Sequence, residues 1–153
     1  MNHLTLAVDV AGIATLTLNR PDKHNALNAA MIAELAEATR QIADDDGIHA
    51  AVLTGSGRSF CAGADLNWMR MQFDATRSER IDQARALASM LDGLNRLPKP
   101  LIGRINGPAY GGGLGLMAVC DVAIAATNAK FAFTETRLGI IPATIGPFVM
   151  ARM

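Results

Sequence analysis

The segment LIGRINGPAYGGGLGLMAVCD, residues 101–121, joins a short apolar run to three consecutive glycines and then to a second apolar stretch. The run Leu101–Ile105 predicts a buried strand, and the stretch Leu114–Val119 predicts a helix. N–H groups in the first turn of a helix have no acceptor within the helix, and the helix dipole favours negative charge beside them. We therefore expect a backbone anion site at the glycines, where a ligand can also approach the main chain closely.

Other interpretations of this glycine turn stay open on spacing alone. The same residues fit a tight turn that only permits close packing. A dinucleotide site is weakly supported, because Gly111, Gly113 and Leu116 do not complete the pattern GxGxxG. No lysine follows the glycines, so the segment is not a Walker loop.

The rest of the chain alternates strands with helices, which predicts an α/β or α+β domain in layers. Residues 59–69, SFCAGADLNWM, are expected to form a loop followed by a polar stretch, and TIGPFVMARM, residues 144–153, starts a helix that lacks a cap and has little to pack against. We interpret that ending as a truncation. The expected strands lie around residues 4–8, 13–18, 50–54, 101–105, 121–125 and 131–133, and the expected helices around 28–47, 81–94 and 114–119.

The composition indicates one soluble domain and gives no sign of a strongly charged binding partner. A chain of 153 residues that is 50% hydrophobic can bury one sizeable core. The 14 basic residues equal the 14 acidic ones, so no positive field favours nucleic acid or an anionic membrane. The two cysteines lack the spacing of a zinc site or a disulfide scaffold, which favours a reducing compartment. With no signal peptide or long apolar span, we expect a cytoplasmic location and no membrane partner.

Two further loops carry residues of chemical interest. In SFCAGADL, residues 59–66, small residues flank an exposed turn that can offer another N–H donor, while Cys61 fits a buried apolar residue better than a nucleophile. Asp65 fits a helix cap as well as a ligand contact. Glu135 follows an apolar strand, where a carboxylate can act as general acid or base. Its alternative is a solvated glutamate paired with Arg137.

Four segments taken together resemble the successive signatures of the enoyl-CoA hydratase/isomerase (crotonase) family. They are RPDKHNALN (20–28), SFCAGADL (59–66), NGPAYGGGLGLMAVCD (106–121) and FAFTETRLGIIP (131–142), and they occur in the family's order. The resemblance implies a crotonase-like spiral of strand-strand-helix units. It also implies that residues 1–153 form a single core domain without the family's C-terminal helices.

The resemblance assigns roles to individual positions of this chain. It implies that the N–H groups of Ala64 and Gly112 form an oxyanion hole for a thioester carbonyl and that Glu135 is the catalytic acid or base. The substrate-binding residues that it implies are Lys23, His24, Ala26, Ala62, Asp65, Leu66, Gly111, Gly115 and Thr134. No metal and no cofactor is implied, since coenzyme A is part of the substrate.

The chain departs from the family's two-glutamate hydratases at one position. Gly115 stands where those hydratases place a first glutamate, so only Glu135 remains. The pattern is most similar to hydratases of the 3-methylglutaconyl-CoA type, which implies addition of water to an enoyl-CoA, including a branched glutaconyl-CoA. Enoyl-CoA isomerases with one glutamate are the alternative. The dehalogenase branch needs an aspartate where this chain has Ala143.

A third interpretation is a non-catalytic module that binds or assembles around acyl-CoA, with apolar surface left exposed. The expected partner in every case is an acyl-CoA thioester, with no nucleic acid. The resemblance implies a homotrimer or homohexamer for the full-length protein.

Overall fold

A five-stranded sheet forms the centre of the computed structural model, which describes residues 1–152. Its order is β1-β2-β3-β4-β6; the first pair is antiparallel and the others are parallel. A second sheet pairs two short parallel strands, β5 and β7. The bounds are β1 Leu4–Val8, β2 Ile13–Leu18, β3 Ala50–Gly55, β4 Leu101–Ile105, β5 Ala109–Tyr110, β6 Val122–Ala125 and β7 Phe131–Ala132.

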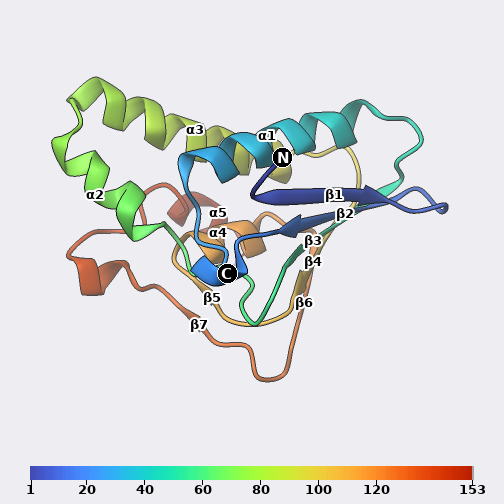
Figure 1. Cartoon of the computed structure of the whole chain (residues 1–153). Helices are drawn as coiled ribbons and strands as arrows, with labels where there is room; N and C mark the ends of the chain where they lie inside the picture. The colour runs from blue at the N-terminus through green and yellow to red at the C-terminus, as the bar shows by residue number, and fades with distance from the viewer. Residues whose placement is uncertain (153) are drawn as a thin grey trace.

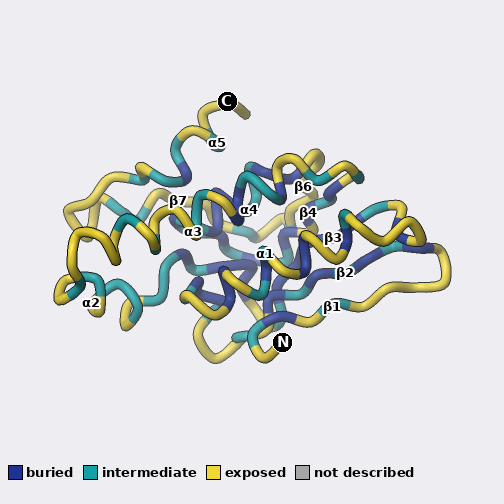
Figure 2. Tube along the Cα trace, turned by 90° about the horizontal axis from the view of Figure 1, so that it is seen from above, coloured by how far each residue is buried: buried dark blue, intermediate teal, exposed yellow. Residues whose placement is uncertain are grey.

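Two long helices, α1 (Ala29–Asp44) and α3 (Arg77–Asn95), pack against each other over one face of the larger sheet (Figure 1). Asn28 caps α1, because its side chain accepts a hydrogen bond from the N–H of Met31 at 2.9 Å. The buried side chains form one continuous cluster between these helices and the sheet, seen as the dark centre of Figure 2. The predicted α/β layering is therefore confirmed.

The shorter elements follow the carboxyl ends of the strands. The η1 turn (Pro21–Lys23) follows β2, α4 (Gly112–Ala118) follows β5, and the η2 turn (Glu135–Leu138) follows β7. Parallel strands point their carboxyl ends to the same edge of a sheet, which is where ligands commonly bind in α/β folds. The final helix, α5 (Gly146–Met150), packs against α4, so the expectation that this segment has little to pack against was wrong.

The prediction that SFCAGADLNWM is a loop was wrong at its end. Residues 66–69 do not continue the loop, because Leu66–Asp74 form a helix, α2, whose first N–H groups are capped by Asp65. Apolar side chains are also exposed along β6 and β7, including Ile124 at 63% and Phe131 at 45%. No helix within residues 1–152 has both the length and the apolar character needed to cross a membrane.

Candidate active site

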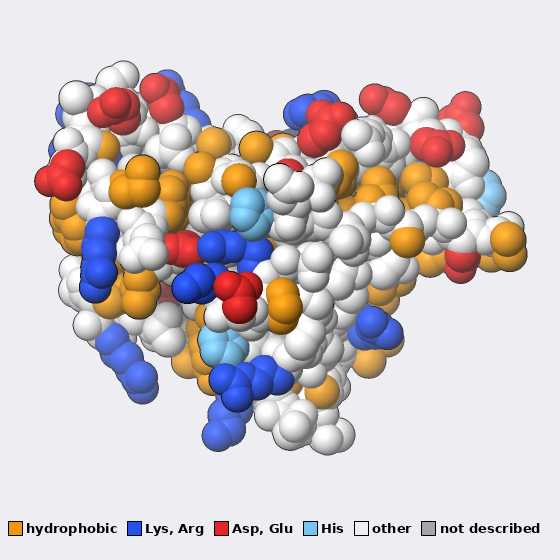
Figure 3. All heavy atoms as spheres, viewed as in Figure 1, with side chains coloured by type: hydrophobic (Ala, Val, Ile, Leu, Met, Phe, Trp, Pro, Cys, Tyr) orange, Lys and Arg blue, Asp and Glu red, His pale blue; other side chains and the backbone are white. Residues whose placement is uncertain are grey.

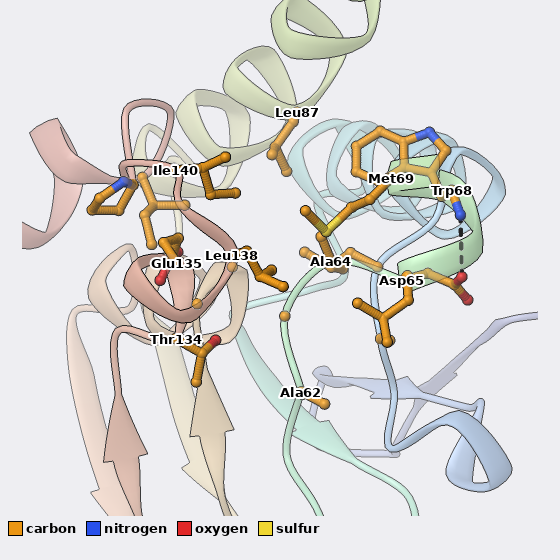
Figure 4. A pocket seen from close by; sticks show the side chains of 18 of the residues that line it. Ala62, Ala64, Asp65, Trp68, Met69, Leu87, Thr134, Glu135, Leu138 and Ile140 are labelled. Carbon is orange, nitrogen blue, oxygen red and sulfur yellow. Dashed lines mark hydrogen bonds between the residues drawn. The ribbon is translucent and has the colours of Figure 1, made fainter. Parts of the chain in front are cut away.

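The carboxyl ends of the strands open into a cavity of about 610 Å³ (Figure 4). Segments far apart in sequence line it: the η1 loop, the turn at residues 62–65, the start of α4, and η2 with the residues that follow. Eleven of the twelve predicted site residues lie in the lining. They are Lys23, His24, Ala26, Ala62, Ala64, Asp65, Leu66, Gly111, Gly112, Thr134 and Glu135.

A short ladder of backbone hydrogen bonds brings the reactive groups together. The N–H of Tyr110 in β5 donates to the carbonyl of Cys61 at 2.9 Å, and the N–H of Gly111 donates to Ala132 in β7 at 3.1 Å. Three chain segments therefore run side by side and in parallel. Two or three residues beyond these bonds come Ala64, Gly112 and Glu135. All three therefore lie at the same end of the ladder.

The turns that carry Ala64 and Gly112 touch main chain to main chain. Gly63 has a φ of +92°, and a Cβ there would lie 2.9 Å from the Tyr110 carbonyl oxygen and 3.4 Å from the Gly112 nitrogen. Only glycine tolerates this conformation and this approach. Both N–H groups lack an acceptor within the described chain: Gly112 is the first residue of α4, and Ala64 lies between two residues bonded to Leu27.

Glu135 faces the cavity from the opposite side of the glycine turn. A Cβ on Gly111 would lie 3.1 Å from Oε1 of Glu135, so the carboxylate sits directly against that turn. Its Oε2 is buried and has no hydrogen-bond partner among residues 1–152. The side chain forms no ion pair with Arg137, so the solvated alternative for Glu135 does not hold. An unpartnered buried carboxylate oxygen at a cavity is free to accept a proton from a ligand.

The η1 loop is held in an unusual backbone conformation. His24 and Asn25 have φ values of 50° and 56°, and buried Asn25 ties the loop down by donating to the carbonyls of Ser56 and Ser59 at 2.9 Å each. Lys23 and His24 line the cavity mouth, and Arg58 contacts the His24 ring at 3.4 Å. Basic side chains gather on this face of the molecule (Figure 3), where they can meet anionic groups.

Asp65 has a structural role that sequence reasoning left open. One carboxylate oxygen accepts from the N–H groups of Asn67 and Trp68, and the other accepts from Arg20 at 2.9 Å. Burial by itself raises the pKa of Asp65, but the hydrogen bonds from Arg20, Trp68 and Asn67 outweigh it and hold the pKa below its usual value. Arg20 also donates to the carbonyl of Ala26, so it joins the η1 loop to the turn that carries Ala64.

An apolar wall, absent from the predicted site, completes the cavity. Figure 4 shows Trp68 and Met69 of α2 on one side, Leu138 and Ile140 on the other, and Leu87 of α3 between them. The sequence carried one signal for it, since Asp65 followed by apolar residues is a helix start.

Gly115 is the one predicted site residue outside the lining. It is buried in α4, and a Cβ there would lie 2.6 Å from Cγ2 of Ile145, which itself lines the cavity. Ile145, 3% exposed, therefore fills the space beside Gly115. In the part of the chain that the structure describes, no three His, Cys, Asp or Glu side chains cluster closely enough to hold a metal.

Comparison with known proteins identifies the family of the chain. The family model described as enoyl-CoA hydratase/isomerase matches residues 9–153. The chain belongs to the enoyl-CoA hydratase/isomerase family. The structure resembles an enoyl-CoA hydratase from Shewanella pealeana with a TM-score of 0.93 and 38% identity, over 97% of this chain and 56% of that one. The crotonase-like α/β fold is therefore confirmed.

Curated relatives include enzymes of two reaction types. The chain is 40% identical to the 1,2-epoxyphenylacetyl-CoA isomerase of Escherichia coli K12, over 93% of this chain and 55% of that protein. It is 35% identical to an enoyl-CoA hydratase of Alternaria alternata, over 92% of this chain and 45% of that protein. The chain spans about half the length of these curated relatives.

We expect Arg20→Met to lower the free energy of unfolding by about 1 to 3 kcal/mol, because it leaves the partly buried Asp65 carboxylate without its charged partner. Asp65→Asn should be destabilising at pH 7, where the wild-type carboxylate is ionised. Because the folded pKa of Asp65 is depressed, the loss should shrink as the pH falls through and below the usual carboxyl range. Denaturant unfolding measures both effects. Arg40→Met removes an exposed ion pair with Glu37 and should change little; an equal loss there contradicts the assignment.

Both cysteines should be unreactive in the folded protein. Burial raises the pKa of Cys61 to about 12, and burial with the nearby Asp121 charge raises that of Cys120 to about 12. A chromogenic disulfide reagent at pH 8 should label both thiols slowly in native buffer and quickly in denaturant. Rapid labelling of the native protein contradicts the buried placement and reopens Cys61 as a nucleophile.

Proposed function

We propose that this chain carries the site of an enoyl-CoA hydratase, which adds water across the double bond of an enoyl thioester. One observation carries the proposal: two backbone N–H groups without acceptors, at Ala64 and Gly112, line the same cavity as Glu135, whose carboxylate has a buried oxygen without a partner in the described chain. The relatives named as hydratases support this reaction type.

The chemistry needs both features. Attack of water on the β-carbon breaks the carbon–carbon π bond and moves its electrons to the thioester oxygen. The N–H groups of Ala64 and Gly112 stabilise the resulting negative charge, and removal of one such donor typically costs about 100- to 1,000-fold in rate. Glu135 takes the proton from the attacking water and returns it to the α-carbon, so that atoms and charge balance with one carboxylate.

The η1 loop is proposed to hold the coenzyme A portion. Lys23 and His24 supply positive charge or donors at the cavity mouth, while Ala26, Ala62 and Leu66 offer main chain and apolar surface. The Asp65 carboxylate is already engaged by Arg20 and α2, so it contributes by fixing the loop. The resemblance of the four motifs adds a branched glutaconyl thioester as one candidate substrate and a homotrimer or homohexamer as the proposed assembly of the full-length protein.

Double-bond isomerisation is the second candidate, favoured by the single carboxylate and by the relative named as an isomerase. Incubation with a 2-enoyl-CoA separates the two reactions: hydration removes the conjugated-thioester absorbance and yields a 3-hydroxyacyl product. A shifted double bond without added oxygen identifies the isomerase instead. A protein that binds the thioester without turning it over would support a non-catalytic role.

Glu135→Gln should lower kcat by about 100- to 10,000-fold, since the amide cannot accept the proton, while binding of a saturated acyl-CoA stays near wild type. Steady-state kinetics and calorimetry measure the two quantities. Glu37→Gln, the same exchange on the exposed face of α1, is the matched control and should leave kcat unchanged. A Glu135→Gln enzyme with full activity would falsify the assigned role.

A further inference from the structure

Two chemically different groups of residues line the cavity. Among the described lining residues, the basic ones are Lys23 and His24, and both belong to the η1 loop. The second group, the apolar wall, consists of uncharged side chains of α2, α3, η2 and the segment that follows η2. They are Trp68, Met69, Leu87, Leu138, Ile140, Ile141, Pro142 and Ile145. Figure 4 shows Glu135 beside Leu138 and Ile140 of this wall.

The apolar wall is built on elements that other contacts hold in place. The Trp68 indole N–H donates to the Gln83 side chain of α3 at 3.3 Å, which ties α2 to α3 and orients the ring. Leu87 lies one turn further along the same face of α3. Next to α4, Ile145 occupies the space beside Gly115. A ligand group entering here therefore meets a preformed apolar surface.

A negatively charged acyl end is disfavoured at such a surface. A carboxylate placed there would lose its hydration, gain no basic partner and approach the Glu135 carboxylate. Arg104 and Arg137 do not line the cavity. Exposed apolar side chains at its rim, Leu138 at 50% and Ile141 at 77%, would instead be covered by an apolar acyl group.

We infer that the acyl group of the substrate is apolar and uncharged, and that the wall formed by Trp68 and Leu87 selects it over an acyl group with a distal carboxylate. This inference rests on the proposed function. It ranks a glutaconyl-type thioester below an uncharged enoyl thioester among the candidate substrates, and it assigns Trp68 and Leu87 as specificity residues.

Two saturated thioesters of equal chain length test the inference: pentanoyl-CoA ends in a methyl group and glutaryl-CoA in a carboxylate. We expect pentanoyl-CoA to bind the wild-type protein about tenfold or more tightly by calorimetry. Equal binding, or tighter binding of glutaryl-CoA, overturns the inference while leaving thioester binding intact. Failure of both ligands to bind overturns the proposed function and the inference with it.

Leu87→Arg sharpens the test by placing a cation on the wall. It should shift the ratio of the two dissociation constants toward glutaryl-CoA by about tenfold. Ala86→Arg adds the same charge to the neighbouring position of α3, which is exposed and outside the cavity, and should leave the ratio unchanged. A shift of equal size in both variants would show a general effect of added charge and would contradict the role of Leu87 in selecting the acyl group.

Discussion

The site depends on one set of main-chain contacts, the ladder that joins Cys61 to β5 and β5 to β7. These bonds connect residues about 50 and 20 positions apart in sequence, and each strand contributes one reactive group just beyond its last bond. Because backbone hydrogen bonds fix spacing and direction, the groups at Ala64, Gly112 and Glu135 gain a defined separation without any contact between their own side chains. Glycine at position 63 makes the approach possible, since any side chain there would meet the Tyr110 carbonyl.

Charge plays a secondary and supporting part around this framework. Arg20 reaches Asp65 on one side and the Ala26 carbonyl on the other, so the loop proposed to hold the coenzyme and the turn proposed to hold the thioester oxygen share one anchor. Asn25 also anchors the loop, through uncharged hydrogen bonds to the carbonyls of Ser56 and Ser59. Most polar groups at the site therefore act on the protein itself, and Glu135 retains a buried oxygen that the described chain leaves unpartnered.

The sequence predicted most of the layering because apolar periodicity and capping residues are local signals. The strands expected around residues 4–8 and 13–18 and the helix expected from residue 28 are examples, and all lie where their patterns place them. Motif resemblance predicted roles for the turns at Ala64 and Gly112 and for Glu135, and all three line the cavity. It did not find the wall, because Trp68, Met69 and Leu87 enter the cavity only once α2 packs beside α3. Periodicity also missed α2, whose nine residues carry no fully buried side chain.

Gly115 and Ile145 illustrate how packing constrains the routes open to this protein over evolution. An acidic side chain at position 115 cannot be accommodated while the isoleucine keeps its place, because the first added carbon already overlaps it. Removing the isoleucine alone leaves a void that no acid fills. Each single replacement is therefore expected to lower the stability of the protein, so a second carboxylate at position 115 requires a smaller residue at position 145 as well.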